Sequence, residues 1–590
     1  MEHPNISAPH NSPDFNQLPT TVAGLAHRSP YTNDGWRDDK SIVTPAHSAP
    51  TNYIHSGLVT PASAYVPPAT APPTTYVPPL TVTAPPDYVP PAVVPYTYTP
   101  AQTFVTPHAY TPYAPYTPHI TPKPKPVVPV DVGDIKGLTG IWNKGNTCYM
   151  NSAIQALGHN YLMTSYLFKD EVKVRATLRA NAKKITKDVE VFKPEAVSPI
   201  PLELREKLAS DDFDPSTLTE EEAEYIYKVS MTGQLTQLLK FMWARNCSVI
   251  PTSFKAVFSE ACNRFFAGYE QHDIGEAFFC IEAALQEELA VKSDVKIHTP
   301  FTPGLGTYVQ NLRDIMRRKA SLLDKGDHQA IDAELTALAK RMPDEALIIS
   351  AYGEMRKYYS SSYSRITEIF TGFLAMSTRC PKPECGFSSH RFEPFTSISL
   401  PMPTDLPAGT VLTLEHCLEE YSKNEVLDEH NMWTCDGCNE KVPAHKRATI
   451  WEPAPTMALQ INRFSMDRSS KDKRHVEYPT TGLDLAPYIT PQNLNPNATY
   501  TYRLQCVANH VGSLTGGHYY SYCLDDDSLR WFKYDDHIVS ELELKQIVTA
   551  TAYILFYMRE DLIVSKPETK TEVTKTETIE TTVIETNATA

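Results

Sequence analysis

Residues 137–157 read Gly137-Leu-Thr-Gly-Ile-Trp-Asn-Lys-Gly-Asn-Thr-Cys-Tyr-Met-Asn-Ser-Ala-Ile-Gln-Ala-Leu157. Gly145 and Asn146 favour a turn, Thr147 can cap a helix, and apolar residues at helical spacing follow Cys148. A thiol at a helix N-terminus lies in the positive end of the helix dipole and near unpaired backbone N–H groups, and both favour the thiolate. The same amides would face an oxyanion on a bound carbonyl. The stretch therefore predicts a nucleophile at Cys148. A structural cysteine is the alternative unless a histidine lies near it.

A histidine with suitable surroundings occurs far downstream, in the run Asn509-His-Val-Gly-Ser-Leu-Thr-Gly-Gly-His-Tyr-Tyr-Ser-Tyr-Cys523. Its Gly-Gly pair permits close backbone approach immediately before His518, and the aromatic residues that follow indicate a strand. A second predicted strand, 531–534, ends at Asp535-Asp536. A carboxylate there could reach His518 Nδ1, fix the tautomer and stabilise the imidazolium. The alternative is a histidine inside a barrel, with both aspartates in a solvated turn.

Several separate blocks of this sequence resemble the ubiquitin-specific proteases, a papain-like family of cysteine deubiquitinases. The blocks occur in that family's order: Gly137 to Ser152, Gln271-His-Asp-Ile-Gly-Glu276, Leu459-Gln-Ile-Asn-Arg-Phe464, Gly516-Gly-His-Tyr519, Trp531 to Asp536, and Ala552-Tyr-Ile-Leu-Phe-Tyr557. The resemblance runs from about Gly137 to Arg559, with inserts. Together the blocks are far more specific than any one of them alone.

The resemblance implies an α+β fold of thumb, palm and fingers, with a zinc-ribbon-like fingertip. Carried over by position, Cys148 matches the nucleophile, His518 the general base and Asp535 the third member of the triad. Asn143 matches the side chain that completes the oxyanion hole, and Asp536 is expected to assist. The implied reaction is hydrolysis of the isopeptide or peptide bond after the C-terminal glycine of ubiquitin, through an acyl-enzyme and without a catalytic cofactor. The expected partners are ubiquitin and ubiquitinated proteins.

Three other functions remain as alternatives. One is a protease for another ubiquitin-like modifier, because the matching blocks do not encode the modifier finely. A second is a catalytically inactive scaffold that binds ubiquitin, which the intact set of Cys148, His518, Asp535 and Asn143 argues against. The third is a zinc-binding interaction protein, which would leave the cysteine and histidine blocks unexplained.

Five residues are candidates for binding the extended, basic tail of ubiquitin. Asp273 and Glu276 are spaced i and i+3 on a predicted helix, so they share a face and could hold basic side chains, with Gln271 just before them. The cleft must admit glycine and exclude side chains, which suits Gly517 and Tyr519 beside the histidine. The alternative for the acidic residues is a solvated pair at a helix start.

Four cysteines form two closely spaced pairs, Cys380-Pro-Lys-Pro-Glu-Cys385 and Cys435-Asp-Gly-Cys438. Two such pairs on neighbouring hairpins would give a tetrahedral sulfur site that suits a structural zinc ion. The first pair has four intervening residues where the resembled family usually has two, and a disulfide or an empty site is the alternative. The other cysteines are expected to be small core residues: Cys247, Cys262, Cys280, Cys417, Cys506 and Cys523.

The chain divides by composition into three regions. Residues 1–133 are rich in Pro, Thr and Tyr, and 28 of the 50 prolines lie before residue 131, so we expect this region to be disordered. It serves either as a spacer or as a docking tail for a partner that binds Pro-rich ligands. Residues 134–560 are the expected catalytic domain, and the Thr/Glu-rich residues 561–590 are expected to be disordered.

Within the expected catalytic domain, helical patterns precede strand patterns, which indicates an α+β fold. Helices are predicted at 147–157, 221–243 and 273–289, and a charged helical insert is predicted at about 300–360. Short β-branched runs follow residue 366, and the zinc-ribbon fingers are expected at about 366–450.

Charge and composition exclude several classes of function. The 590 residues contain 54 Lys and Arg against 69 Asp and Glu, a net charge of −15 that argues against a nucleic-acid binder. The sequence contains no run of about 18 apolar residues, so no membrane-spanning helix is expected. The first residues do not resemble a secretory signal. The chain has 11 cysteines without an export signal, which favours a reducing, intracellular location in the cytoplasm, the nucleus or both.

Overall fold

The computed structural model describes residues 135–186, 200–262, 264–268, 270–293, 304–321, 325–464, 470–513 and 516–563. They all belong to one of the two units into which the chain divides, and the other unit, residues 53–133, is outside the described residues. The disorder predicted for 1–133 and for nearly all of 561–590 therefore concerns residues that are not described. No described helix is long and apolar enough to cross a membrane.

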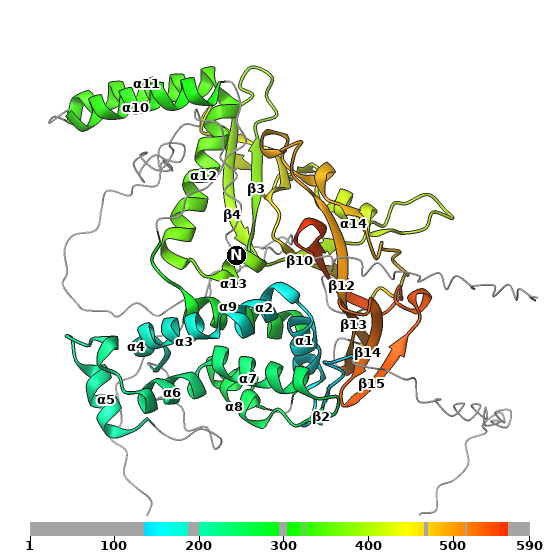
Figure 1. The fold of residues 1–590 in the computed structure, drawn as a ribbon. Helices are drawn as coiled ribbons and strands as arrows, with labels where there is room; N and C mark the ends of the chain where they lie inside the picture. The colour runs from blue at the N-terminus through cyan, green and yellow to red at the C-terminus, as the bar shows by residue number, and fades with distance from the viewer. Residues whose placement is uncertain are drawn as a thin grey trace, which may run out of the picture. The chain divides into compact units, whose positions relative to one another are not determined.

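Helices make up the first half of the described chain, and Figure 1 shows them in cyan to green. They are α1 (Cys148–Gly158), α2 (Tyr161–Lys169), α3 (Glu171–Ala180), α4 (Ala182–Thr186), α5 (Leu202–Ala209), α6 (Glu220–Val229), α7 (Met231–Ala244), α8 (Thr252–Ala261) and α9 (Ile274–Leu289). Every residue of α1 is buried, and α1 packs on α9 and on the sheet strand β13 (Gly516–Asp525). The element that begins at Cys148 is thus the central helix of this region.

The single helix predicted at 221–243 is wrong, because the chain forms α6 and α7 with Ser230 between them. Ser230 has extended backbone angles, and its side chain accepts a hydrogen bond from the Gly233 N–H, as an N-cap does. An apolar pattern that continues across both helices conceals this break. Ser230, a residue type that often caps helices, was the local signal from which this break could have been predicted.

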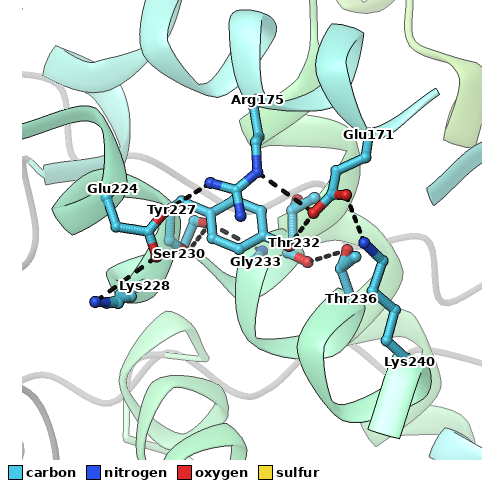
Figure 2. Close-up of polar contacts among 10 residues, drawn as sticks. All are labelled: Glu171, Arg175, Glu224, Tyr227, Lys228, Ser230, Thr232, Gly233, Thr236 and Lys240. Carbon is cyan, nitrogen blue, oxygen red and sulfur yellow. Dashed lines mark hydrogen bonds and ion pairs between the residues drawn. The ribbon is translucent and has the colours of Figure 1, made fainter. Parts of the chain in front are cut away.

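A cluster of charged side chains holds α3, α6 and α7 together, as Figure 2 shows. Arg175 of α3 donates to Glu224 of α6 at 2.7 Å and to Glu171 at 3.3 Å, and its guanidinium lies 3.6 Å from the ring centre of Tyr227. Lys240 of α7 also bonds to Glu171. The three helices are therefore joined by one shared network rather than by isolated pairs.

Two acidic residues of α9 are buried. Glu288 accepts hydrogen bonds from the backbone N–H groups of Met231 (2.7 Å) and Thr232 (2.8 Å), at the start of α7. A carboxylate at this place satisfies amides that a helix cannot pair internally. Glu282 accepts from Gln286. Burial raises the pKa of Glu282 to about 8 and that of Glu288 to about 7.

A mostly antiparallel sheet forms much of the second half of the unit, and Figure 1 shows its strands β12 to β15 in orange to red near α1. Its strand order is β15-β14-β13-β12-β16-β10-β5, and β11 pairs with β12 off this path. The remaining bounds are β12 (Thr501–Ser513), β14 (Arg530–Asp535), β15 (Ile538–Leu542), β16 (Ala552–Arg559), β10 (Thr456–Asn462), β5 (Ser397–Pro401) and β11 (Leu483–Asp484). Only the β10–β5 pair is parallel among the described pairs of this sheet. A buried apolar cluster fills the face that includes Leu459, Leu504 and Leu555.

A second sheet lies in residues 372–452. It has the order β4-β3-β9-β6, and two further short strands, β7 and β8, pair nearby. The bounds are β3 (Gly372–Arg379), β4 (Ser388–Phe395), β6 (Glu425–Val426), β7 (Trp433–Thr434), β8 (Lys441–Val442) and β9 (His445–Glu452). In the chain, α13 (Arg365–Phe370) precedes β3, and α14 (Leu414–Tyr421) lies between β4 and β6. Together with the helical first half, the two sheets confirm the predicted α+β fold.

Three helices occupy the segment where a helical insert is predicted: α10 (Leu305–Ser321), α11 (Lys325–Arg341) and α12 (Pro343–Ser362). Their apolar residues share a buried cluster with Phe373, Phe392 and Trp451 of the second sheet. Two short parallel strands, β1 (Gly140–Ile141) and β2 (Ser248–Val249), lie apart from both sheets. The described 3-10 helices are η3 (Pro215–Thr217), η4 (Ala486–Tyr488), η5 (Pro491–Asn493), η6 (Leu544–Gln546) and η7 (Glu560–Leu562).

A disulfide joins Cys262, at the end of α8, to Cys280 of α9, with the two Cα atoms 6.1 Å apart. The sequence predicted small core residues at both positions and did not find this pairing, and the same prediction for Cys247 is wrong because that thiol is exposed. The two cysteines are 18 residues apart in sequence, and only the packing of the two helices brings them together. Cys506 and Cys523 lie opposite each other on β12 and β13 as free, buried thiols.

Candidate active site

Cys148 is the first residue of α1, and its thiol is buried. The preceding turn contains Asn146 with a φ of 56°, a left-handed conformation that asparagine tolerates well. Thr147 occupies the N-cap position, but its side chain does not cap the helix. Instead, Thr147 Oγ1 accepts from the Lys144 N–H at 2.9 Å. The sequence thus predicted the start of the helix correctly. It did not predict the role of Thr147, whose hydroxyl stabilises the preceding turn instead of capping the helix.

Asn143 is held in one orientation from both ends of its amide. Its Oδ1 accepts a hydrogen bond from the Thr147 N–H at 2.9 Å, and its Nδ2 donates to Asp536 Oδ2 at 3.1 Å. The other carboxylate oxygen of Asp536 accepts from Asn151 Nδ2 at 2.8 Å. Asp536 has a φ of 50°, which turns its side chain away from the course of β14. The carboxylate therefore bridges Asn143 and α1.

His518 and Asp535 form a short polar contact, with 2.6 Å between Nε2 and Oδ1. The prediction that the carboxylate reaches Nδ1 is wrong: Asp535 ends the strand next to that of His518, and there it faces Nε2. Nδ1 is consequently the ring nitrogen left for exchanging a proton with a thiol. Lys533 donates to the other oxygen of Asp535 at 2.8 Å. Burial disfavours ionisation of Asp535, but Lys533 and His518 outweigh it and lower the pKa of this carboxyl.

The thiol of Cys148 is neutral in this resting arrangement. Burial is the largest influence and raises its pKa, and the charge of Asp536 adds to this. The backbone N–H groups of Tyr519, Tyr149 and Cys148 itself lower this pKa, but their effect does not prevail. Among the described contacts, no hydrogen bond joins Cys148 to His518. The helix start alone therefore does not produce the thiolate predicted from the sequence.

Two of the residues predicted to bind the basic tail, Gln271 and Gly517, contact each other next to His518. Gln271 Oε1 accepts from the Gly517 N–H at 2.6 Å, and Gln271 Nε2 donates to Asn146 Oδ1 at 3.4 Å. A side chain at position 517 would collide with His510 Nε2, which lies 2.3 Å from the place of its Cβ. Gln271 thus connects the loop before Cys148 with the strand of His518, and glycine is required at 517.

Asp273 and Glu276 do not form the expected pair on one helix face. Asp273 precedes α9 as its N-cap, and its Oδ1 accepts from the Gly275 N–H at 2.7 Å. Its Oδ2 accepts from the hydroxyls of Tyr519 (3.2 Å) and Tyr553 (2.7 Å). Glu276 lies in the first turn of α9. In this arrangement Asp273 acts as a structural centre between α9, β13 and β16.

Sequence reasoning did not find several residues of this neighbourhood. Lys471 donates to Nδ1 (2.9 Å) and to the carbonyl oxygen (2.7 Å) of His510, whose ring stacks on Tyr519 at a centroid distance of 4.5 Å. Burial, followed by the charge of Lys471, lowers the pKa of His510 to about 4. Lys533, Asn151 and Tyr553 were also not predicted. Each of these residues contacts a residue that is distant in sequence, or looks like an ordinary member of a strand, so no short segment of sequence indicates its role.

Cys380 and Cys385, between β3 and β4, come together with Cys435 and Cys438, between β7 and β8. Their sulfur atoms lie within 4.8 Å of one another, so they could hold a metal ion. All four are unpaired thiols, and the Gly437 N–H donates to Cys435 Sγ at 3.3 Å, as amides do around metal-bound sulfur. The donor set and its closeness fit a tetrahedral ion despite the wider spacing of the first pair.

Comparisons with known proteins agree with this geometry. The family described as ubiquitin carboxyl-terminal hydrolase matches residues 139–557. A probable ubiquitin carboxyl-terminal hydrolase of Acanthamoeba polyphaga mimivirus is 41% identical over 431 residues, covering 73% of this chain and 92% of that protein. The ubiquitin carboxyl-terminal hydrolase Usp2 of Drosophila melanogaster is 27% identical over 72% of this chain, but only 35% of its own length is matched.

A similar solved structure is the SAGA Ubp8/Sgf11/Sus1/Sgf73 DUB module bound to ubiquitin aldehyde, with 20% identity, a TM-score of 0.43, and coverage of 72% of this chain and 70% of that one. The family match spans the segment that contains Cys148, His518, Asp535 and the four-cysteine group. This chain therefore belongs to the ubiquitin carboxyl-terminal hydrolase family.

Proposed function

We propose that this protein is a deubiquitinating cysteine protease that hydrolyses the bond after the C-terminal glycine of ubiquitin. One observation carries the proposal: two consecutive aspartates join the distant segments, because Asp535 contacts His518 at 2.6 Å and Asp536 accepts from Asn143 (3.1 Å) and from Asn151 of the helix that Cys148 begins (2.8 Å). A nucleophile, a base and the carboxylate that orients the base thus come from segments about 370 residues apart and meet at one place. The family match supplies the substrate class.

The reaction begins with proton transfer from the Cys148 thiol to His518 Nδ1. Asp535 holds the opposite ring nitrogen at 2.6 Å and stabilises the imidazolium that results. The thiolate attacks the carbonyl carbon of the last glycine, so that a C–S bond forms and the carbonyl oxygen becomes an oxyanion. Because the resting thiol is neutral and unlinked to His518, binding of the ubiquitin tail must bring the two together.

Asn143 and the backbone amides at the start of α1 stabilise the oxyanion. An amide nitrogen carries two hydrogens, and Asn143 donates one of them to Asp536, which leaves the second for the developing charge. His518 then protonates the leaving amine, and the C–N bond breaks. The same histidine activates a water molecule that releases ubiquitin from the acyl-enzyme. No step requires a cofactor.

The role proposed for the four-cysteine group is structural. Zn²⁺ is the ion that suits four thiolates in a tetrahedral arrangement, and the group lies at the ends of the β3–β4 and β7–β8 hairpins, outside the sheet of His518. Cys380, Cys385, Cys435 and Cys438 would then cross-link these two hairpins within a small apolar cluster.

Labelling with ubiquitin that carries a thiol-reactive C-terminal warhead tests the proposal directly. We expect one adduct, mapped by peptide sequencing to Cys148 and lost in Cys148→Ala. Cys247→Ala is the matched control, because Cys247 is an exposed thiol outside the site and its removal should leave labelling unchanged. If a warhead on another ubiquitin-like protein reacts while the ubiquitin probe does not, the modifier is wrong. If a folded protein reacts with neither probe, the chain is a scaffold.

A further inference from the structure

The strand next to that of His518 carries a lysine two residues before Asp535. Lys533 and Asp535 both belong to β14, and side chains two residues apart in a strand point to the same face of the sheet. Lys533 Nζ lies 2.8 Å from Asp535 Oδ2, while Asp535 Oδ1 lies 2.6 Å from His518 Nε2. One carboxylate thus joins a lysine to the proposed base.

The side chain of Lys533 is held in place by its neighbours, and only 31% of it is exposed. The pairing of β13 with β14 sets Lys533 opposite Tyr522, and its Nζ lies over the ring of Tyr520, 4.4 Å from the ring centre. The Tyr520 hydroxyl is hydrogen-bonded to Thr551 Oγ1 at 3.0 Å. A cation over an aromatic face is attracted by the electrons of the ring. The ammonium group is therefore confined between an aromatic ring and the carboxylate.

This lysine determines how Asp535 faces the histidine. Asp535 is the last residue of β14, and 32% of its side chain is exposed, so packing alone does not fix the torsion angle of its carboxylate. A hydrogen bond to Oδ2 removes this freedom and leaves Oδ1 toward His518 Nε2. The ring of His518 is then held with Nδ1 available to the thiol.

The charge of Lys533 acts on the same pair. When His518 takes the proton of Cys148, the carboxylate acquires a second positive neighbour, and the lysine repels this new charge. The lysine therefore weakens the stabilisation of the imidazolium. Burial is the main reason for the raised pKa of the Cys148 thiol, and a weaker base acts in the same direction on the proton transfer. The imidazolium, once formed, gives its proton to the leaving amine more readily.

Other titratable groups surround the histidine and the carboxylate, from β12, β13, α1 and the adjoining loops: His510, Tyr522, Cys148, Lys471 and Asp536. Burial, followed by the charges of Lys471 and His518, lowers the pKa of His510 to about 4, so that ring is neutral near pH 7. On β15, Ile538 and Ser540 lie opposite Asp535 and Lys533 and add no charge. Among the described residues, Asp535 forms ion pairs with Lys533 and His518, so the lysine is the cation that acts on this pair directly.

We propose that Lys533 is a positioning residue for the reaction: it holds Asp535 against His518 and sets the lower end of the pH range in which the enzyme is active. This inference rests on the proposed function and adds to it a residue that touches no reacting atom. Because the lysine disfavours a second positive charge beside the carboxylate, the histidine should remain available as a base at lower pH than an aspartate–histidine pair alone would allow.

The test follows kcat/KM for ubiquitin aminocoumarin amide against pH in the wild type and in three variants. Lys533→Met removes the donor and the charge, Lys533→Gln keeps a donor without the charge, and Lys533→Arg keeps both. We expect the midpoint of the acidic limb to rise by about half a pH unit in the Met and Gln variants and to stay constant in the Arg variant. The plateau value should fall about 10-fold in Lys533→Met and less in the other two.

The matched control is Lys545→Met, because Lys545 is an exposed lysine of η6 that pairs with Glu543, away from the catalytic pair. It should change neither the midpoint nor the plateau. Circular dichroism over the same pH range identifies variants that fold, and Lys533→Gln carries the test if Lys533→Met does not fold.

Two results overturn this proposal alone: a midpoint that stays constant when the charge of Lys533 is removed, or one that moves equally in Lys533→Arg. A purely structural lysine would lower kcat/KM at every pH without moving the midpoint. A folded wild-type protein that does not cleave the aminocoumarin amide overturns the proposed function, and this proposal with it.

Discussion

At the scale of single residues, Asp535 and Asp536 are neighbours in sequence with different partners. Asp535 bonds to the histidine, whereas Asp536 bonds to Asn143 and Asn151. The two carboxylates point in different directions because the left-handed φ of 50° at Asp536 turns the second carboxylate toward α1. In the proposed mechanism, Asp535 therefore orients the base, and Asp536 positions the amide that would face the oxyanion.

The variant Asp536→Asn tests the charge of the second aspartate. The carboxylate raises the pKa of the Cys148 thiol, so its neutralisation should lower that pKa. The rate of iodoacetamide alkylation of Cys148, followed against pH, should then reach its midpoint at a lower pH than in the wild type. Turnover should nevertheless fall by about 10- to 100-fold, because asparagine has a single acceptor oxygen and cannot hold both Asn143 and Asn151. An alkylation midpoint that stays constant or rises would contradict this reasoning.

At the scale of elements, α9 contains two buried acids that should make the stability of the protein depend on pH. Burial raises the pKa of Glu282 to about 8, above the ordinary value of an exposed glutamate. A group with a raised pKa in the folded state contributes its full stability below the pKa of the unfolded state, and this is lost as the pH rises through the folded pKa. Glu282 should therefore make the protein progressively less stable from about pH 4.5 to about pH 8.

Glu282→Gln should reduce this dependence, since glutamine does not titrate. Urea unfolding at pH 5 and at pH 8 measures the difference, and the wild type should lose more free energy of unfolding between the two values than the variant. Glu287→Gln is the matched control, because Glu287 is an exposed neighbour on the same helix. Equal pH dependence in the wild type and Glu282→Gln would show that Glu282 is already ionised at low pH.

The junction of α3, α6 and α7 gives a second prediction at this scale. Arg175→Met keeps an apolar stem over Tyr227 but removes the bonds to Glu171 and Glu224 that Figure 2 shows. These groups are partly exposed, so we expect a loss of only about 1 kcal/mol in the free energy of unfolding, less at high salt. Lys173→Met removes a well-exposed lysine from the same helix and should have almost no effect. Equal losses in both variants would contradict a shared network.

At the scale of the whole molecule, the four-cysteine group and the active site lie in different sheets. Removing the metal should therefore affect folding more than chemistry. We expect about one zinc ion per chain by elemental analysis, and Cys435→Ser should lose it and unfold at a lower temperature, while whatever folds retains labelling at Cys148. Cys417→Ser alters a buried cysteine outside the group and should keep its zinc. A Cys435→Ser protein that folds normally but does not react would contradict a purely structural role.

Much of the site is readable from short segments. Cys148 is the first residue of a helix because a turn-forming Gly-Asn pair, a threonine and a helical apolar pattern follow one another within a few residues. The strands of His518 and Asp535 are readable in the same way, from runs of aromatic and β-branched residues around an acidic turn. The break at Ser230 was missed because a single capping residue is a weaker signal than a continuous apolar face.

The sequence by itself determined which residues carry the chemistry and which local elements hold them, because turns, caps and spacing depend on near neighbours. Tertiary structure alone decided that Asp535 meets Nε2, that Asp273 ties α9 to two tyrosines and that Cys262 pairs with Cys280. It also decided that Asn143 and Asp536, 393 residues apart, share a hydrogen bond. Such contacts arise only when distant segments pack, and packing sets ring orientation and desolvation, so a neutral thiol lies where the helix start alone predicted a thiolate.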